Sequence, residues 1–484
     1  MAKDITEKVR QLRSEGVPEE DAIRQAAAPE DAESEESDDT DEEAPDISEA
    51  SRQFVIVTKD FSGLGWAKTL QSEGEDVVIA TDYAAEEDPD FRKMMRRVGE
   101  GWVDVLSLSE ALTKYRTEST YWVMAENCFP EFVAKLRAAD QKVFPPNFEL
   151  GEELEHDRNK ATDLADSVGL APPSTHEFSA TAEALSFLDD NPDTAYVFKP
   201  DSSEFNYMTF VPARKADTDA NREVYTYLEH LTADVGSFVL QERIPKDEAI
   251  EVNVELWLQD GVPFLALLGL ELKRKNPDDL GEMTGCAGDF VQIIPLDCKL
   301  VTQTVGKLLP FYEDEGYSGF ADVNVLITKD GQPYFLEVCN RFGYNAHVTM
   351  LLGLLKGTYG DFIADYVEGN TADFGQRFTD QVAGSLCLFL DHPRDGLPIH
   401  VDPAADARWY PFDGREEEGQ MLLTGYTQEI GILVDTGSDI PSVAAKLVDQ
   451  LRHKEAVSVP DLYYRTDTDC VQQRMTALKS RGLL

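Results

Sequence analysis

Residues Lys273–Phe290 read KRKNPDDLGEMTGCAGDF, and this stretch decides the fold. Two adjacent cations, Lys273 and Arg274, open it, and after several acidic residues it closes on the small residues of Thr284–Gly288. Glycines let a backbone approach a ligand closely, and the amides of such a turn can face an anion. Cations just before a turn of this kind suit a phosphate or a carboxylate. Composition alone fits an ordinary surface loop between two strands equally well, so the order of the residues has to decide.

A second stretch brings carboxylates onto two neighbouring strands. Residues 319–327 (GFADVNVLI) are expected to form a strand, and the Asp-Gly pair at 330–331 centres the turn after it. Pro333 opens the next strand, where a missing amide is tolerated. This strand carries Glu337 and ends at Val338, just before CNRFG. Asp322 and Glu337 therefore stand on two strands that are joined by this turn.

Both stretches resemble the glycinamide ribonucleotide synthetase (phosphoribosylamine–glycine ligase) family of the ATP-grasp class. The family's loop reads KR, four residues, D, one residue, G, two residues and TGGMGAY. The matching positions are Lys273, Arg274, Asp279, Gly281, Thr284, Gly285 and Gly288. Cys286 and Ala287 replace the family's GM pair, and Asp289 and Phe290 replace its final AY. The resemblance covers about residues 52–470.

The family's metal motif EFNxRFG corresponds to the residues that follow the second strand. Glu337, Arg341, Phe342 and Gly343 match it. The family's asparagine falls on Cys339, and Asn340 stands one place on. Period-two alternation aims Cys339, rather than Asn340, along with Glu337 unless the strand has already ended.

The resemblance implies a multidomain protein of mixed α/β and α+β class. The expected parts are an acidic, largely disordered N-terminal extension (1–51), an open α/β domain (52–150), an ATP-grasp domain (151–376) and a small β-rich C-terminal domain (377–484). Residues 54–57 (FVIV), 77–80 and 121–124 are apolar runs that predict buried strands of the first domain. The GLG at 63–65 is by itself a weak nucleotide fingerprint.

The resemblance also implies an ATP site with Mg²⁺ (or Mn²⁺). Lys160 and Lys199 would hold phosphates, and Glu251 would hold the ribose. Backbone groups of Glu242, Arg243 and Ile244 would read adenine. Glu337, Asp322 and Asn340 are the predicted metal ligands. Glu251, Asn253 and Glu255 share one strand face, which is equally the pattern of the wet side of a sheet.

The predicted catalytic residues are Arg341, Lys273 and Arg274, and the predicted acceptor-binding residues are Glu126, Thr284, Gly285 and Gly288. Several family features are missing. Residues 201–208 lack the glycines of the family's phosphate loop. The first domain lacks the Arg and His of GGREHA and keeps only Glu126 of GPExPL, so it either binds a phosphosugar or merely packs.

The net charge and the cysteines indicate the environment in which the protein works. The 92 acidic and 44 basic residues give a net charge of −48, of which residues 1–50 contribute −13. A solvated acidic surface is typical of proteins that work in high salt, and it argues against non-specific nucleic-acid binding. The six cysteines form no CxxC, no apolar run reaches the length of a membrane span, and MAKDITEKVRQ is not a signal peptide. These features predict a cytoplasmic, halophilic protein without a membrane partner.

The extension at residues 1–51 has two interpretations. Its acidic half cannot bury a core and is expected to be disordered. It is either a solubilising tail or a tethered helix pair that docks onto a protein partner.

Three functions remain open at this point. The first is an ATP-dependent carboxylate–amine ligase of purine biosynthesis that uses glycine and phosphoribosylamine. The second is an ATP-grasp ligase with another acid and amine. The third is an inactive family member that acts as a binding or structural protein.

Overall fold

The computed structural model describes residues 52–83, 86, 88–201, 208–212, 217–244, 249–342 and 345–484. The predicted extension at 1–51, Gly343 and residues 202–207 of the glycine-poor loop lie outside the described residues. The described residues belong to one compact unit, Ala50–Leu484.

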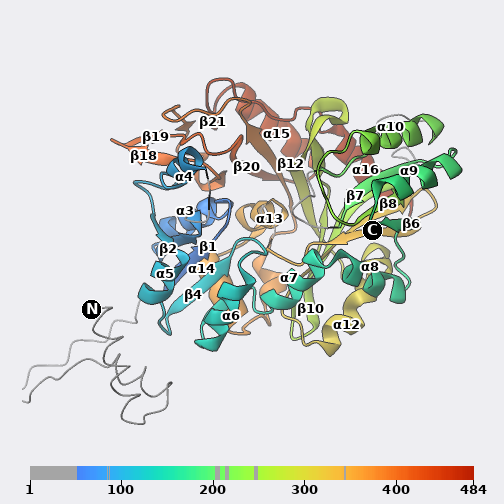
Figure 1. The fold of residues 1–484 in the computed structure, drawn as a ribbon. Coiled ribbons are helices and arrows are strands. Elements are labelled where there is room, and N and C mark those ends of the chain that lie inside the picture. Colours follow the sequence, from blue (N-terminus) through green and yellow to red (C-terminus); the bar gives the residue numbers. More distant parts are fainter. Residues whose placement is uncertain are drawn as a thin grey trace, which may run out of the picture. The chain divides into compact units, whose positions relative to one another are not determined.

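The first sheet is open, and all its strands are parallel (Figure 1). Its strands are β1 (Gln53–Val57), β2 (Asp76–Thr81), β3 (Asp104–Ser107), β4 (Thr120–Met124) and β5 (Lys142–Phe144), in the order β3-β2-β1-β4-β5. The connecting helices are α3 (Leu64–Ser72), α4 (Pro89–Met95), α5 (Leu108–Lys114) and α6 (Pro130–Ala138). The direction of strand order reverses beside β1. Ligands of such sheets bind outside the carboxyl ends of the strands at this switch point.

The glycines of the GLG sequence allow α3 to pack closely. A Cβ at Gly65 would lie 2.4 Å from the ring of Tyr410, and one at Gly63 would lie 2.5 Å from Cγ2 of Ile56. Tyr410 also donates from Oη to the carbonyl of Ser62 at 2.8 Å. Close packing against β1 and against the C-terminal part of the chain therefore accounts for both glycines.

A small antiparallel sheet follows two helices. It consists of β6 (Thr175–Phe178), β8 (Phe238–Glu242) and β7 (Tyr196–Pro200), in the order β6-β8-β7, and the helices before it are α7 (Phe148–His156) and α8 (Arg158–Ser167). Helices α9 (Thr181–Asp190) and α10 (Asp217–Glu229) cover it. Leu188 and Val224 of these helices pack with Phe198 and Leu240 of the strands in a separate apolar cluster.

A large sheet runs through the rest of the chain. Its order is β14 (Pro333–Val338), β13 (Gly319–Thr328), β9 (Ala249–Gln259), β10 (Val262–Gly269), β12 (Leu280–Ile294), β15 (Val382–Phe389), β20 (Glu429–Gly437) and β17 (Trp409–Pro411), and β11 (Leu272–Asn276) pairs with β12. The pairs along this order are antiparallel. Strand β12 pairs with β15, so the sheet continues past residue 376 into the C-terminal part of the chain.

Helices pack on the sheets from several parts of the chain. Helix α13 (Ala346–Leu354) contacts β12, β15 and β20, α15 (Ile440–Arg452) contacts β15 and β20, and α14 (Tyr359–Val367) contacts β5 and α3. The remaining elements are α11 (Lys299–Gln303), α12 (Leu309–Asp314), α16 (Asp469–Ser480), β16 (His400–Val401), β18 (Arg415–Glu417), β19 (Gln420–Leu422), β21 (Val457–Ser458) and short 3₁₀ turns at Pro277–Asp279, Val305–Leu308, Phe374–Arg377 and Asp406–Arg408. Among the residues that the structure describes, no helix is both long and apolar enough to cross a bilayer.

Aromatic side chains join the parallel sheet to the large one. The ring centroid of Phe144 on β5 lies 5.7 Å from that of Phe320 on β13 and 5.5 Å from that of Phe342. Trp66 of α3 lies 4.1 Å from Phe342. Phe342 is buried and directly follows Arg341, so this cluster fixes the backbone beside a predicted catalytic residue.

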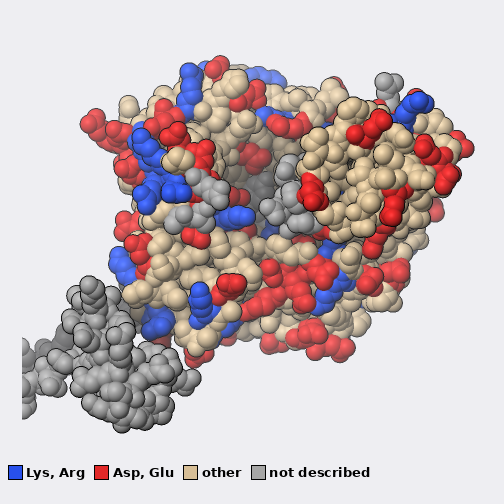
Figure 2. All heavy atoms as spheres, viewed as in Figure 1, with Lys and Arg blue, Asp and Glu red and all other residues tan. Residues whose placement is uncertain are grey.

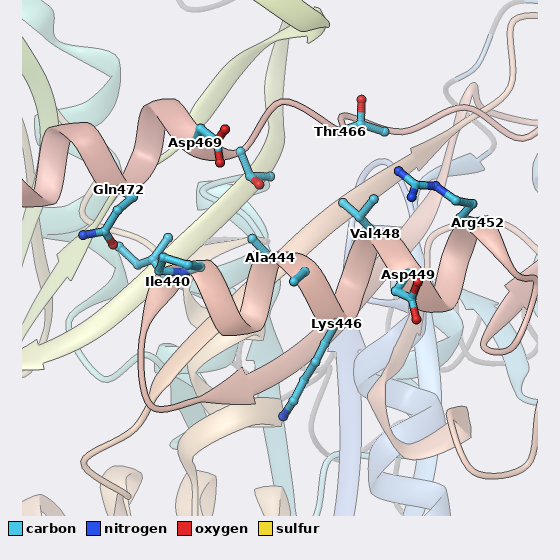
Figure 3. Close-up of a pocket in the computed structure, with 12 residues that line it drawn as sticks. Ile440, Ala444, Lys446, Val448, Asp449, Arg452, Thr466, Asp469 and Gln472 are labelled. Carbon is cyan, nitrogen blue, oxygen red and sulfur yellow. The ribbon is translucent and has the colours of Figure 1, made fainter.

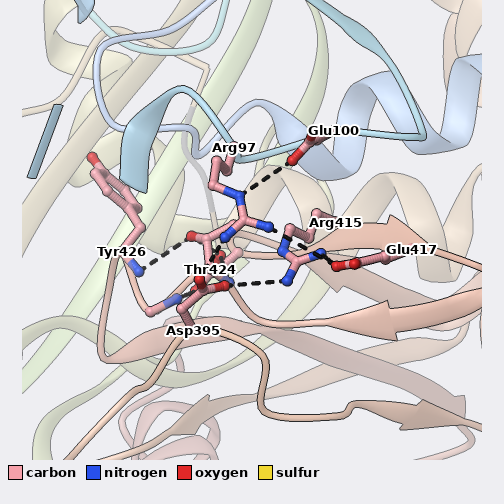
Figure 4. A network of polar contacts seen from close by, with 9 residues as sticks. Arg97, Glu100, Asp395, Arg415, Glu417, Thr424 and Tyr426 are labelled. Carbon is pink, nitrogen blue, oxygen red and sulfur yellow. Dashed lines mark hydrogen bonds and ion pairs between the residues drawn. The ribbon is translucent and has the colours of Figure 1, made fainter. Parts of the chain in front are cut away.

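An ion-pair network ties the segment after α4 to the β18–β19 hairpin (Figure 4). Arg97 contacts Asp395 at 2.5 Å and Glu100 at 3.3 Å. Arg415, whose side chain is nearly buried, pairs with Glu417 and lies 3.3 Å from Asp395. Asp395 therefore links Arg97, which follows α4, to Arg415 of β18.

The predicted turn at Thr284–Gly288 is wrong, because these residues lie inside the strand β12. The chain reverses earlier, where Asp278, Asp279 and Gly281 have φ values of 59°, 53° and 80°. A Cβ at Gly288 would lie 2.9 Å from the carbonyl oxygen of Ser385 on β15. This glycine therefore serves strand pairing, and neighbouring strands override its turn propensity.

Candidate functional site

The carboxylate of Glu337, at the end of β14, is the centre of the candidate site. Burial raises the pKa of this carboxyl, but Arg158, Lys273, Lys199 and Arg341 together outweigh burial and hold the pKa below its usual range. Arg158 begins α8, Lys199 lies on β7, Lys273 lies on β11, and Arg341 follows β14. Four segments distant in sequence therefore bring cations to one carboxylate.

This concentration of positive charge contrasts with the protein surface. Figure 2 shows acidic side chains spread over the visible face, whereas Lys and Arg gather over α4 and the residues just after it. That stretch contains Arg92, Lys93, Arg96 and Arg97. In a chain of net charge −48, a group of cations that surrounds an interior carboxylate is suited to a polyanionic ligand.

Lys199 is the cation near Glu337 whose charged form is most destabilised by its surroundings. Burial and the charge of Arg158 lower its pKa to about 8, against the opposing charges of Glu337 and Glu251. Within the described residues its ammonium group has no ion pair. The predicted Lys199, Glu251, Lys273, Arg341 and Glu337 are thus brought together, as their mutual electrostatic effects show.

Arg341 is oriented by a carboxylate of α7. Its Nε donates to Oε1 of Glu155 at 2.9 Å, and this charge is the main reason that the pKa of Arg341 is raised well above its usual value. Oε2 of Glu155 in turn accepts from Nδ2 of Asn127 at 2.7 Å. A chain of three side chains therefore fixes the guanidinium on the edge of the site.

Lys273 forms an ion pair with a carboxylate of its own segment. Its Nζ lies 2.5 Å from Oε2 of Glu271. Burial lowers the pKa of Lys273, but Glu271, Glu251 and Glu337 raise it well above its usual value. This lysine is therefore a permanent cation of the site.

Two predicted residues lie apart from this group. Lys160 forms an ion pair of 2.6 Å with Glu153, and Arg274 donates from Nη1 to the carbonyl of Gly281 at 2.7 Å. Arg158, two residues before Lys160, is the cation of α8 that acts on Glu337. The side chain of Asp157 accepts from the amide of Lys160 at 2.9 Å and caps α8, so Arg158 stands at the first position of the helix.

The end of β14 turns Cys339 and Asn340 to different sides. Sγ of Cys339 accepts from Nδ2 of Asn324 at 3.8 Å, and strand register places Asn324 opposite Glu337. Oδ1 of Asn340 accepts from the amide of Asp322 at 3.1 Å, and its Nδ2 donates to Oη of Tyr312 at 2.7 Å. Cys339 therefore lies on the Glu337 side, as the alternation predicted, and Asn340 is held within the protein interior.

The neighbouring strands offer oxygen atoms that suit a hard cation. Asn253 pairs with Asn324 across β9 and β13, and Asn324 pairs with Glu337 across β13 and β14. Oδ1 of Asn253 and Oδ1 of Asn324 are both buried without a hydrogen-bond partner. Asp322 is also buried, and its Oδ1 accepts from Nδ2 of Asn253 at 2.5 Å. The donor set fits Mg²⁺, which binds carboxylate and amide oxygens.

A cavity of about 320 Å³ adjoins the cations. Arg158, Lys199, Gln241 and Leu336 are among its lining residues. This volume lies within the range of small-ligand pockets. The cavity therefore extends the site from Arg158 and Lys199 toward β8.

The backbone of the predicted adenine segment is partly engaged by the fold. The amide of Glu242 donates to the carbonyl of Ser174 at 2.7 Å, and the amide of Arg243 donates to that of Ala195 at 2.8 Å. The side chain of Arg243 donates to the carbonyl of Pro212 at 3.3 Å. Ile244 is the last described residue before a gap. The fold therefore already uses two of the amides that were predicted to read adenine.

Glu126 lies at the switch point of the parallel sheet. It accepts from Oγ1 of Thr58 at 2.5 Å, from the amide of Lys59 at 3.0 Å and from Oγ of Ser62. Burial and the neighbouring Asp60 raise the pKa of Glu126 to about 8. Two carboxyl groups that share this edge disfavour a phosphate and favour a cationic or hydrogen-bond-donating group.

The remaining predicted acceptor residues belong to β12. Oγ1 of Thr284 donates to the carbonyl of Lys273 at 2.9 Å. Gly285 is exposed, and Gly288 packs against β15. Thr284 thus supports the backbone beside Lys273.

The sequence did not reveal Arg158, Glu155 or Asp60. For Arg158 a signal exists, since Asp157 is a good N-cap residue and a capped helix places its first side chain close to the end of the preceding helix. Glu155 and Asp60 stand among many acidic residues, and no local pattern distinguishes them.

A second cavity, of about 580 Å³, lies between α15 and α16. Figure 3 shows Ile440, Ala444 and Val448 on α15 and Gln472 on α16 around it. None of the predicted site residues lines this cavity, so it is separate from the cation group.

No family model and no curated protein match the sequence. Solved structures match its fold. Phosphoribosylamine–glycine ligase from Thermotoga maritima is 19% identical with a TM-score of 0.61, and the match covers 86% of this chain and 99% of that one. A biotin carboxylase complex with βγ-ATP from Campylobacter jejuni is 14% identical with a TM-score of 0.59 and coverage of 88% and 95%. An L-amino acid ligase from Bacillus licheniformis is 15% identical with a TM-score of 0.54 and coverage of 85% and 99%.

These three enzymes belong to the ATP-grasp class, and the chain aligns with them over most of its length. The chain therefore has the ATP-grasp fold, and its predicted resemblance to phosphoribosylamine–glycine ligase is confirmed at the level of the fold.

Proposed function

We propose that this protein is an ATP-dependent ligase that joins a carboxylate to an amine through an acyl phosphate. The observation that supports this function best is the convergence of Arg158, Lys199, Lys273 and Arg341 on the carboxylate of Glu337. Such a site binds a triphosphate electrostatically and keeps one carboxylate for a metal ion. The ATP-grasp fold supplies the wider context.

Each charged residue has a distinct role in this proposal. Lys199 and Arg158 hold the phosphates, and Lys199 becomes fully protonated when the anion binds. Glu337 and Asn324 would hold Mg²⁺ (or Mn²⁺), which would offset phosphate charge when bound. Arg341, oriented by Glu155, stabilises the phosphoryl group during transfer.

The bonds change in two steps. A carboxylate oxygen of the acid attacks the γ-phosphorus of ATP, and ADP leaves. The amine then attacks the acyl carbon, inorganic phosphate leaves, and the amine loses a proton. The protein supplies position and charge rather than a covalent nucleophile.

Calorimetric titration of Mg-ATP tests the nucleotide site. We expect Lys199→Ala to weaken binding by about tenfold or more, since a charge-assisted contact is lost. Lys446→Ala, which removes an exposed lysine of α15, is the matched control. Lys160→Ala tests whether Lys160 or Arg158 is the cation of α8 that holds the phosphates. Unchanged binding supports Arg158, and loss of binding restores the sequence prediction.

The finer assignment takes glycine and phosphoribosylamine as the substrates, in a reaction of purine biosynthesis. It is supported by the motif positions Lys273, Thr284, Glu337 and Arg341. Release of ADP with this pair, and not with either substrate alone, is the expected result. ADP release that needs another pair would replace this assignment.

A second candidate is a ligase with a different acid and amine. The pair Asp60 and Glu126 supports it, because the Asp60 carboxylate beside a buried, protonated carboxyl repels a phosphosugar and accepts a cationic amine. A panel of amino acids and amines in the ADP-release assay distinguishes the two candidates. Lack of ATP binding at millimolar nucleotide would exclude both, and would favour a binding protein whose extension engages a protein partner.

A further inference from the structure

Glu271, Cys286 and Asp289 form a cluster beside the cation group. One carboxylate oxygen of each acid and Sγ of the cysteine all lie within 4.8 Å of one another. Across the described part of the chain, this is the one group of three such side chains that meets this spacing. None of the three was predicted as a site residue. Cys286 and Asp289 stand where the sequence departs from the TGGMGAY pattern.

A bulge in the β11–β12 ribbon brings the cluster together. In a regular strand Cys286 and Asp289 would point to opposite faces of β12. Leu272 pairs with Gly288, and Arg274 pairs with Met283. An advance of two residues along β11 therefore corresponds to an advance of five residues along β12. A bulge of this kind re-aims side chains and is common beside functional sites. It places the thiol on the same side as the two carboxylates.

The carboxyl group of Asp289 is fully buried without a hydrogen-bond partner for either of its oxygens. Burial and the charge of Glu271 raise its pKa to about 8, against the opposing charge of Lys273. Buried polar groups are otherwise almost always hydrogen bonded, and an unpaired buried carboxylate is costly. A bound cation would supply the missing partner.

We propose that Glu271, Cys286 and Asp289 bind a divalent transition-metal ion of zinc type. A thiolate with two carboxylates suits zinc, whereas Mg²⁺ disfavours sulfur. The charges also balance. Three deprotonated ligands carry three negative charges, the ammonium of Lys273 offsets one, and a divalent ion offsets the other two. This site goes beyond the proposed ligase function and does not rest on it.

The geometry requires only a small adjustment. Zinc bonds of about 2.0–2.3 Å in a tetrahedron place ligand atoms about 3.5 Å apart, against separations of up to 4.8 Å here. Cys286 and Asp289 are buried, and the side chain of Glu271 is 16% exposed, so the ion would enter past Glu271. One oxygen of Glu271 already contacts Lys273, which leaves the other oxygen for the ion.

Titration of the full chain with Zn²⁺ after chelator treatment tests the proposal. We expect saturable binding of one ion per chain that excess Mg²⁺ does not displace. We also expect Zn²⁺ to raise the unfolding midpoint, because an ion that binds only the folded state stabilises it. Absence of binding by the wild-type protein would overturn the proposal.

Matched variants identify the ligands. Asp289→Asn and Cys286→Ser should each abolish the saturable phase, and Glu271→Gln should weaken it strongly. Cys387→Ala, which alters another buried cysteine on β15, should leave it intact. Unfolding measured in chelator shows that each variant folds. If Asp289→Asn and Cys286→Ser both keep wild-type zinc affinity, the cluster is an uncharged buried carboxyl beside a thiol, and the proposal is wrong.

Discussion

Nε of Arg341 donates to Oε1 of Glu155 at 2.9 Å, and this contact joins the segment after β14 to helix α7. It makes Glu155 a positioning residue for the guanidinium. The neighbouring Phe342 is packed against Trp66 and Phe144, so the backbone beside Arg341 is fixed as well. The side chain and the backbone of this residue are therefore held by different parts of the fold.

Glu155→Gln should lower kcat by about tenfold to a hundredfold, with little change in the affinity for Mg-ATP. The substitution keeps the shape but loses the charge that orients Arg341, and small misplacements of a reacting group are costly. Steady-state kinetics and calorimetry measure the two effects separately. Glu149→Gln is the matched control, since Glu149 of the same helix forms an exposed ion pair with Arg137. Equal effects of both substitutions would mean that Glu155 acts only through stability.

Affinity for ATP should fall above pH 8, because the pKa of Lys199 in the free protein is about 8. Bound phosphates favour the charged lysine and raise its pKa. Below pH 8 the lysine is already protonated, and above it binding requires proton uptake. The expected loss is about tenfold per pH unit until the pKa of the complex is reached. Lys199→Arg stays charged and should remove the decline, whereas a decline of equal slope in this variant would assign it to another group.

Glu126→Gln should stabilise the protein at pH 8 and not at pH 5. The folded pKa of about 8 exceeds the ordinary value of 4.5, so the folded state binds more protons between these values, and stability falls as pH rises through that window. The glutamine does not titrate. We expect a gain of at least about 1 kcal/mol at pH 8 in urea unfolding. An equal change at both pH values would show that proton binding is not the cause.

Gly65→Ala should destabilise the fold by about 1–3 kcal/mol, since overpacking has this cost. The added Cβ would meet the ring of Tyr410 at 2.4 Å. Gly375→Ala is the control, because its Cβ would meet only the carbonyl of Phe264 at 3.5 Å, and its effect should stay within about 0.5 kcal/mol. Urea unfolding of both variants provides the comparison. A harmless Gly65→Ala would contradict the close packing of α3.

Salt should raise the unfolding midpoint of this protein. The net charge of −48 produces self-repulsion in the compact state, and KCl screens it as the Debye length shrinks from about 10 Å at 0.1 M to about 3 Å at 1 M. Thermal unfolding across this range measures the effect. An uncharged osmolyte of equal osmolality separates screening from exclusion effects. A midpoint independent of KCl would argue against the predicted halophilic character.

The sequence predicted those elements whose signals are local. The Asp-Gly pair at 330–331 forms the expected turn, with φ of 86° at Gly331, and β14 begins at Pro333. The apolar runs became the buried strands β1, β2 and β4. Periodicity and turn chemistry depend on adjacent residues. They therefore predict the observed element correctly where pairing with a neighbouring strand does not change it.

The errors arose where distant segments decide the outcome. Thr284–Gly288 has turn-forming composition, but pairing with β11 and β15 extends it into a strand. Arg158, which the sequence did not single out, acts on Glu337 from the start of α8, where the cap at Asp157 places it. Glu155 acts through Arg341, which is remote from it in sequence. Only the folded chain shows these partnerships.

The pairing of β12 with β15 determines where the polypeptide can be divided. A chain that ended near residue 376 would lose β15 and leave one side of β12 with unsatisfied amide and carbonyl groups. Such an edge is a template for association between molecules. The C-terminal segment therefore protects the sheet that carries the predicted ligase residues, and a division of the gene at this boundary is expected to give aggregation-prone fragments rather than two independent proteins.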